Sequence, residues 1–162
     1  MIENGKSPFV TYQFVCRDAS GAIKWEETVN NVVTTEGKDF LLDSFLKGSN
    51  YTAAFYLGLA SAGSKAATDS LATHAAWTEL TPYAGNRPAI AWGTSTLNGT
   101  DGINTATGVV FTANAGATVT GAFICNVASG TSGKLYSVSD LTAPKTLLSG
   151  DTLTVTPTIR MQ

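Results

Sequence analysis

Residues 152–159 read Thr-Leu-Thr-Val-Thr-Pro-Thr-Ile, in which apolar side chains alternate strictly with threonines. Side chains of a β-strand point alternately to its two faces, so this pattern predicts a strand with one face in a core and a threonine face in solvent. A proline cannot donate a hydrogen bond to a neighbouring strand. Pro157 therefore predicts that this strand lies at the edge of its sheet.

Alternation of the same kind extends to the N-terminal part of the chain. The segment 10–16 places its apolar residues on one face, and a turn over 18–21 returns the chain into a second strand over about 22–30. In 118–127 both faces are apolar or small, which predicts a strand covered on two sides. Shorter strands are predicted over 55–60, 87–92, 109–111 and 134–138.

One segment, over about 35–47, predicts a helix. Thr34 and Thr35 are typical N-cap residues, and Gly48 is placed to end the helix. Gly37 inside the helix costs about 1 kcal/mol relative to alanine. An apolar stripe is expected to lie against a sheet, and it consists of Phe40, Leu41, Leu42, Phe45 and Leu46.

The spacing of these elements predicts a mainly β protein. Thr68 or Asp69 would cap a second short helix over about 69–75. With about eight to ten short strands separated by turn signals, the chain is expected to form an antiparallel β-sandwich or jelly roll. No repeat or linker divides it, so residues 9–162 are interpreted as one domain and residues 1–8 as a polar N-terminal arm.

The composition excludes several kinds of partner. Only 14% of the 162 residues are charged, against a usual fraction of about 25%, and the net charge is −2. Such a chain offers no basic field for nucleic acid or anionic lipid. It also lacks the run of roughly 18 apolar residues that spans a bilayer. Neither a nucleic acid nor a membrane is therefore expected as a partner.

Residues that carry chemistry are scarce. His74 is the one histidine, so any Ser–His or Cys–His catalytic unit would have to use it. A structural zinc site needs four nitrogen or sulfur ligands, and one histidine with Cys16 and Cys125 supplies three. We therefore predict no catalytic residue, no metal site, no cofactor and no enzymatic activity. The start of the chain lacks a secretion signal, which favours buried free thiols over a disulfide between the two inward-facing cysteines.

Two aromatic residues remain outside the predicted strands. Trp25 and Trp92 are in phase with apolar neighbours and are interpreted as core, whereas Trp77 and Tyr83 lie in an irregular stretch and are free to be exposed. Three roles are open for Trp77 and Tyr83: a sugar platform, a protein-contact anchor, or closure of the end of the sandwich. Closure is the role we favour among the three.

The segment 29–43, with Thr34-Thr35-Glu36-Gly37, resembles the opening helix of small tailed-phage structural proteins. Further pieces follow in the same order: 55–59, 69–79 ending in His74-Ala75-Ala76-Trp77-Thr78-Glu79, Asn86-Arg87-Pro88, Gly121-Ala122-Phe123, and Ser149-Gly150-Asp151-Thr152-Leu153. Together they cover roughly residues 29–158 and resemble phage capsid cement or decoration proteins, which include jelly-roll proteins.

The resemblance implies a virion structural protein that is made in the bacterial host cytoplasm and binds the outer surface of the phage head. Its expected partners are the major capsid protein and further copies of itself, as a dimer or trimer. We take Trp77, Tyr83, Ile2 and Pro8 as candidate protein-contact residues. The alternative hypothesis is a carbohydrate-binding β-sandwich module of a phage tail or fibre. A hydrolase is the third hypothesis, and the single histidine disfavours it.

Overall fold

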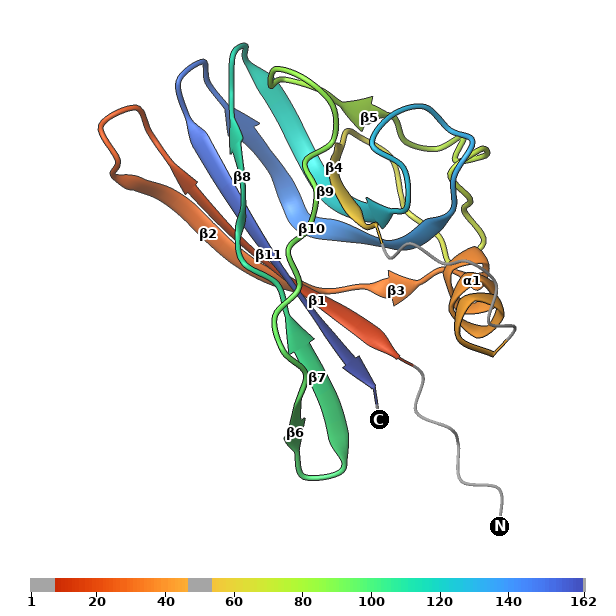
Figure 1. The fold of residues 1–162 in the computed structure, drawn as a ribbon. Coiled ribbons are helices and arrows are strands. Elements are labelled where there is room, and N and C mark those ends of the chain that lie inside the picture. The colour runs from red at the N-terminus through yellow and green to blue at the C-terminus, as the bar shows by residue number, and fades with distance from the viewer. Residues whose placement is uncertain (1–7, 47–53, 162) are drawn as a thin grey trace.

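The computed structural model describes residues 8–46 and 54–161, and in these ranges it contains eleven strands and one helix (Figure 1). The elements are β1 (Phe9–Arg17), β2 (Ile23–Asn30), β3 (Val32–Val33), α1 (Thr35–Leu46), β4 (Tyr56–Ala60), β5 (Glu79–Leu80), β6 (Thr96–Asn98), β7 (Asp101–Thr105), β8 (Val109–Thr112), β9 (Ala117–Cys125), β10 (Leu135–Leu147) and β11 (Thr152–Met161).

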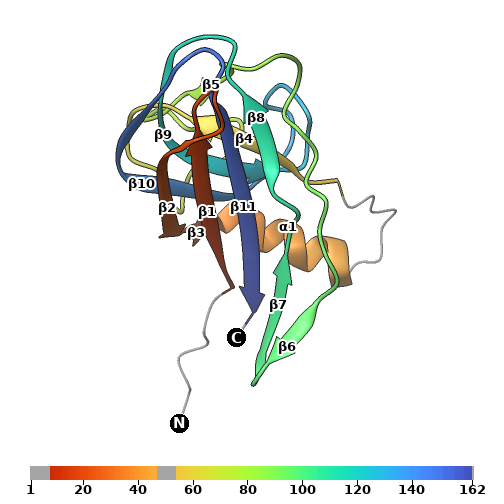
Figure 2. The same cartoon turned by 90° about the vertical axis from the view of Figure 1, so that its left-hand side faces the viewer.

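The strands form two antiparallel sheets. The first sheet has the order β2-β1-β11-β7-β6, and β8 also pairs with β11; the second has the order β3-β10-β9-β4-β5. Figure 2 shows the first sheet in front of the second, with the β6–β7 hairpin extending beyond the body. The expected β-sandwich is therefore confirmed. Its strands slightly outnumber the predicted eight to ten because β3 and β5 have only two residues each.

The core lies between the two sheets and is built by the alternation read from the sequence. Val10, Tyr12, Phe14 and Cys16 of β1 are fully buried, as are the facing Leu153 and Val155 of β11. The Tyr12 hydroxyl lies 2.5 Å from the Ser137 hydroxyl of β10, so a polar contact joins the sheets through the core. In β9 both faces are covered as predicted, because residues 122–125 are each at most 1% exposed.

Pro157 corrects the expected position of the last strand. β11 lies inside its sheet, with β1 on one side and with β7 and β8 on the other. Pro157 falls between the residues that pair with β8 and those that pair with β7, and its carbonyl accepts a hydrogen bond from Ala106 N at 3.0 Å. Because the N–H and C=O of a strand residue point to the same side, the missing N–H faces this break. A proline is tolerated there without loss of a ladder bond.

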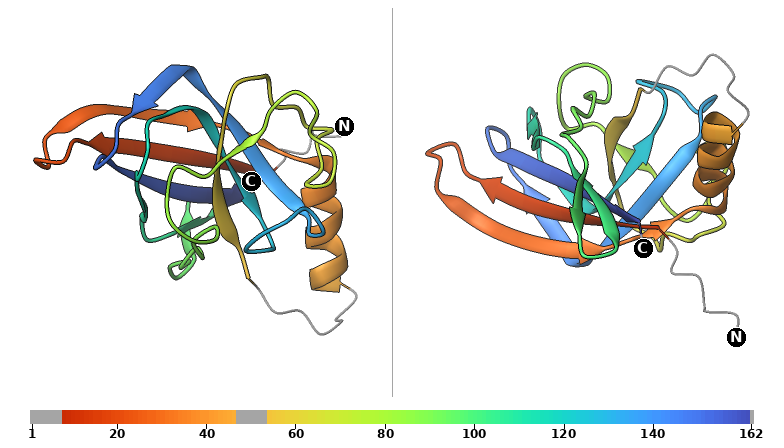
Figure 3. Two further views of the ribbon diagram at one scale, coloured as in Figure 1. Left: turned by 90° about the horizontal axis from the view of Figure 1, so that it is seen from above. Right: turned by 60° about the horizontal axis from the view of Figure 1, so that its bottom comes forward.

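Helix α1 confirms the predicted helix and its cap. The Thr34 hydroxyl accepts from Gly37 N at 2.9 Å, and the Thr34 carbonyl accepts from Lys38 N at 3.0 Å. The predicted stop at Gly48 lies outside the described residues. Figure 3 shows the helix at one flank of the sandwich, and the apolar stripe is covered only in part, since Leu42 is 60% exposed.

Two predicted elements are wrong. The helix over 69–75 is absent because Ser70 and Thr73 exchange two backbone hydrogen bonds in a tight turn, and Asp69 accepts from Ala66 N and from an indole instead of capping a helix. Residues 87–92 form only isolated bridges, at 89 and 92, because this segment crosses from one sheet to the other.

Candidate functional site

Trp77 is buried, which agrees with closure, the role favoured for it among the three that were open. Its side chain is 2% exposed, and the His74 ring stacks on it at a centroid distance of 4.0 Å. Phe123 packs against it at 5.2 Å, and its indole N–H donates to Asp69 Oδ2 at 2.8 Å. The residue therefore closes a secondary core beside β9 and presents no free ring face to a sugar.

Tyr83 lies in a different place, at the border of the main core. Its ring meets Phe111 edge to face at a centroid distance of 4.8 Å, and 8% of the side chain is exposed. Burial raises the pKa of Tyr83 to about 12, and the charge of Glu79 acts in the same direction. Its buried hydroxyl has no hydrogen-bond partner among the described residues. The fold thus separates Trp77 from Tyr83 and does not combine them into one aromatic patch.

The other two candidate contact residues lie at the N-terminus. Pro8 is partly buried directly before β1, and Ile2 lies outside the described residues.

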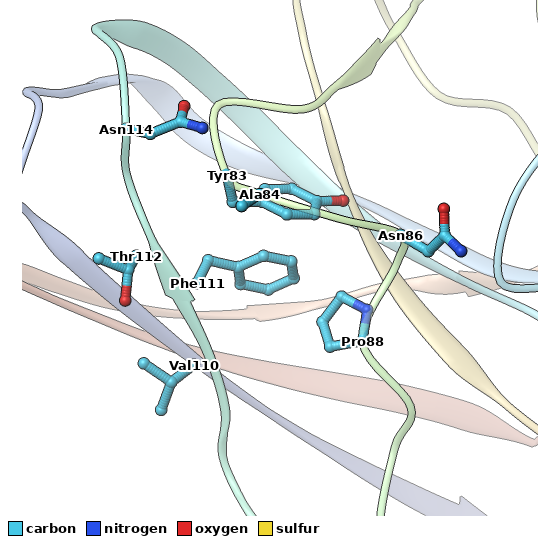
Figure 4. A pocket seen from close by; sticks show the side chains of 8 residues that line it. All are labelled: Tyr83, Ala84, Asn86, Pro88, Val110, Phe111, Thr112 and Asn114. Atoms are coloured by element: carbon cyan, nitrogen blue, oxygen red, sulfur yellow. The ribbon is translucent and has the colours of Figure 1, made fainter.

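Tyr83 lines a pocket of about 370 Å³ between β8 and the segment 83–88 (Figure 4). Tyr83, Phe111 and Pro88 form its apolar part, with the Tyr83 ring lying across the pocket between the Asn114 and Asn86 side chains. This volume lies in the range of small-ligand and side-chain pockets. The remaining lining residues are Ala84, Val110 and Thr112, so no charged residue lines the pocket.

The pocket exists because the chain from 82 to 91 moves from one sheet to the other and back. At its start, Asn114 N donates to Pro82 O at 2.7 Å, and at its end Thr107 N donates to Ala91 O at 2.9 Å. Between these two points the segment bonds to the second sheet instead, through Pro88 O, which accepts from Leu57 N at 3.0 Å. The residues 110–112 of β8 are thereby left without a neighbouring strand on this side.

The sequence motif around Thr34 and Glu36 serves the scaffold. The Glu36 carboxylate accepts from Leu135 N at 2.7 Å and from Leu71 N at 3.0 Å, and so joins three segments distant in sequence. The Thr34 hydroxyl caps the helix and also donates to Leu135 O. These contacts explain why the helix begins here against β10.

Arg87 forms a second scaffold cluster, which no local pattern of the sequence indicates. Its guanidinium makes two hydrogen bonds of 2.7 Å with the Glu79 carboxylate, and it donates to Val127 O at 3.0 Å and Gly130 O at 2.9 Å. It also lies 5.3 Å from the Phe123 ring centroid. With 5% of the residue exposed, Arg87 pins β5 to the loop after β9. The adjacent Asn86 and Pro88 are thereby held at the pocket.

Asp151 is the third cluster. Its carboxylate accepts from Lys24 Nζ at 2.5 Å and from Leu148 N at 2.8 Å, while its carbonyl accepts from Ala113 N at 2.8 Å. Burial raises the pKa of Asp151, but the Leu148 N–H and Lys24 outweigh it and hold that pKa below its ordinary value. Asp151, the acidic residue of the Ser149–Leu153 segment, thus fastens the turn between β10 and β11.

Reactive groups are held in unreactive surroundings. Cys16 and Cys125 are buried free thiols, as predicted, and burial raises the pKa of both. In the ranges 8–46 and 54–161, no group of three His, Cys, Asp or Glu side chains is placed to hold a metal ion. No helix within these ranges is long and apolar enough to cross a membrane.

Comparison with known proteins places the chain in a family. A family model described as "Podophage GP4 fiber I protein gp80" matches residues 33–159, from β3 to β11, and so spans both sheets. The chain belongs to this fiber I protein family. No curated protein and no solved structure matches the chain. Membership in the fiber I family confirms the broader expectation of a phage structural protein of the virion. The expected capsid cement or decoration family is not what matches.

Proposed function

We propose that the chain is a structural subunit of a phage fibre, which acts by holding other proteins rather than by catalysis. The observation that carries this proposal is the match to the fiber I family over residues 33–159. The match includes strands of both sheets and leaves out β1 and β2, so the family relationship concerns most of the folded unit.

The use of polar residues supports a structural role. Glu36, Arg87 and Asp151 are each occupied by hydrogen bonds that fasten separate segments. His74 is stacked on Trp77, and its Nδ1 lies 3.0 Å from Trp77 O. Polar side chains used in this way fix the segments to one another, which suits a subunit that acts by holding other proteins.

The capsid cement role is the second candidate, and it differs from the fibre role in its partner. A cement protein would bind the major capsid protein on the shell, whereas a fibre subunit would bind other fibre proteins or copies of itself. Sugar binding through Trp77 and Tyr83 receives no support from their geometry, because both rings are at least nine-tenths buried.

Immunogold electron microscopy of purified virions separates these roles. Antibodies against the purified domain are expected to label fibres, while label spread over the shell would instead establish the cement role. Virions that carry no label, and no peptide of the chain by mass spectrometry, would overturn both. Co-sedimentation of the domain with purified shells provides the control, and we expect no binding there at micromolar concentration.

A further inference from the structure

The pocket beside Tyr83 exposes an unpaired sheet edge. β8 pairs with β11 on one side, where Ala113 N donates to Asp151 O and Phe111 lies opposite Leu153. Backbone groups of a strand alternate between its two sides, so the N–H and C=O groups of Val110 and Thr112 point away from β11. No described residue bonds to these groups, and the equivalent groups of Asn114 are used, since Asn114 N donates to Pro82 O.

This edge has a defined length. It is closed at one end by the Asn114–Pro82 hydrogen bond and at the other by the Thr107–Ala91 hydrogen bond, so the open part consists of residues 110–112. An edge of this length offers the backbone groups of two residues, Val110 and Thr112, to a short extended segment. No residue in the described part of the chain forms a strand beside residues 110–112 on the side away from β11.

The surroundings of the edge favour an uncharged, partly apolar occupant. Tyr83, Phe111 and Pro88 provide an apolar wall, and Val110 is 56% exposed beside it. The nearby charges of Glu79 and Arg87 are paired with each other and do not line the pocket. A charged side chain entering here would lose water without gaining a partner.

We propose that this pocket binds an extended, uncharged peptide segment of a partner protein, which adds to the sheet as a strand beside β8. Val110 and Thr112 would exchange backbone hydrogen bonds with the peptide, and an aliphatic side chain of the peptide would enter between Tyr83 and Pro88. Strand addition takes affinity from main-chain bonds and specificity from such a pocket. The N–H and C=O groups of an extended peptide repeat at the same spacing as those of the open edge, and the hydroxyl groups of a sugar do not. A peptide is therefore the better match. The inference goes beyond the fibre role and does not rest on it.

The probe is the synthetic peptide Ac-Thr-Leu-Thr-Val-Thr-NH2, and the control is a copy methylated at every backbone nitrogen. The ¹⁵N-labelled full chain is titrated with each peptide and followed by amide chemical shifts. We expect shifts to concentrate at 83–88 and 110–114, and we expect the Val110 and Thr112 amides to gain protection from hydrogen exchange. The methylated copy should not bind, because it keeps the side chains and loses the donors.

Two variants test the edge directly. Val110→Pro removes an N–H that faces the pocket and leaves the bonds to β11 in place, and it is expected to weaken binding about tenfold. Val110→Thr keeps the N–H and should bind like the native chain. Thermal unfolding of both variants checks that they fold, and the methylated peptide gives the same test without any variant.

Several results would overturn the proposal. Equal binding of the two peptides would show that strand pairing is not involved, and unchanged affinity of Val110→Pro would show that the edge is not used. Absence of any shift at millimolar peptide would exclude an uncharged extended peptide as the occupant. Shifts at 110–112 with soluble glycans and not with peptides would assign the pocket to sugar. None of these results depends on where the virion carries the chain.

Discussion

Gly37 of helix α1 lies against the backbone of Tyr136 in β10, so closely that a Cβ atom at Gly37 would overlap the Tyr136 carbonyl oxygen. The same carbonyl accepts from Thr34 N at 3.1 Å, which brings the helix start onto the strand. The glycine that is a weakness within an isolated helix is therefore the residue that lets the helix approach the sheet.

Replacement of Gly37 by alanine is expected to destabilise the protein, opposite to the effect of this change in an ordinary helix. Helix propensity would favour alanine by about 1 kcal/mol, whereas the overlap with a backbone atom costs about 1–3 kcal/mol or more. We expect a net loss of up to about 2 kcal/mol in the free energy of unfolding, measured in urea. Lys38→Ala, at the next and exposed position, should stay within about 0.5 kcal/mol. A stabilised Gly37→Ala protein would show that the helix does not sit this close.

Arg87→Lys is expected to lower the free energy of unfolding by about 2–4 kcal/mol, because lysine cannot reproduce the paired hydrogen bonds to Glu79 or reach both loop carbonyls. Chemical denaturation of Arg87→Lys, Glu79→Gln and the double variant gives the coupling between the two residues. Arg17→Lys, at an exposed strand end, is the matched control and should change stability little. Additive effects of the two cluster variants would contradict a coupled pair.

The pKa of Asp151 predicts acid sensitivity. That pKa lies below its ordinary value of 3.8 in the folded chain, because hydrogen bonds from Leu148 N and Lys24 outweigh burial. The stabilisation is therefore present above pH 3.8 and is lost as the pH falls through the folded pKa. Urea denaturation at a series of pH values gives the slope of the free energy of unfolding against pH. This slope should be shallower in Asp151→Asn than in the native chain. Asp18 and Glu27, whose pKa values are also lowered, should retain part of the slope. An unchanged slope would assign the acid sensitivity to other groups.

Trp77→Phe tests whether Trp77 closes the secondary core. The change removes the hydrogen bond to Asp69 and leaves a space beside His74, so we expect a loss of about 1–3 kcal/mol. Trp25→Phe is an informative control, since the buried indole nitrogen of Trp25 has no partner among the described residues and its removal breaks no hydrogen bond. The Trp25 variant should lose less stability. A reversed order in thermal unfolding would argue against the role of the Asp69 bond.

Short-range patterns were sufficient for the elements that follow them. The alternation in 10–16, 118–127 and 152–159 located β1, β9 and β11, and Thr34 located the start of α1. Such patterns report which face of a strand is apolar, and they do not report which strand lies alongside. Pro157 illustrates the difference, because its tolerance depends on a break between β7 and β8, which pair with β11 from earlier in the chain.

The candidate site could be predicted only in part. The sequence identifies Tyr83 as an aromatic residue outside the strands, but its pocket partners Phe111 and Asn114 lie about thirty residues further along the chain. The piece Asn86-Arg87-Pro88 is the sequence signal that points to the pocket, since it contains Arg87, which holds this segment in place, and two lining residues. Whether Trp77 was exposed could not be read from sequence, because His74, Asp69 and Phe123 cover it through contacts that no local pattern specifies.

The sequence by itself determined the antiparallel sandwich, the capped start of helix α1 and the low charge, because strand alternation and capping act over a few residues. Only the tertiary structure decided the position of Pro157, the burial of Trp77 and the approach of Gly37 to Tyr136. It also decided that residues 110–112 of β8 pair with β11 on one side and have no neighbouring strand on the other. These features depend on contacts between segments that lie far apart in the chain, and those contacts form only when both sheets are in place.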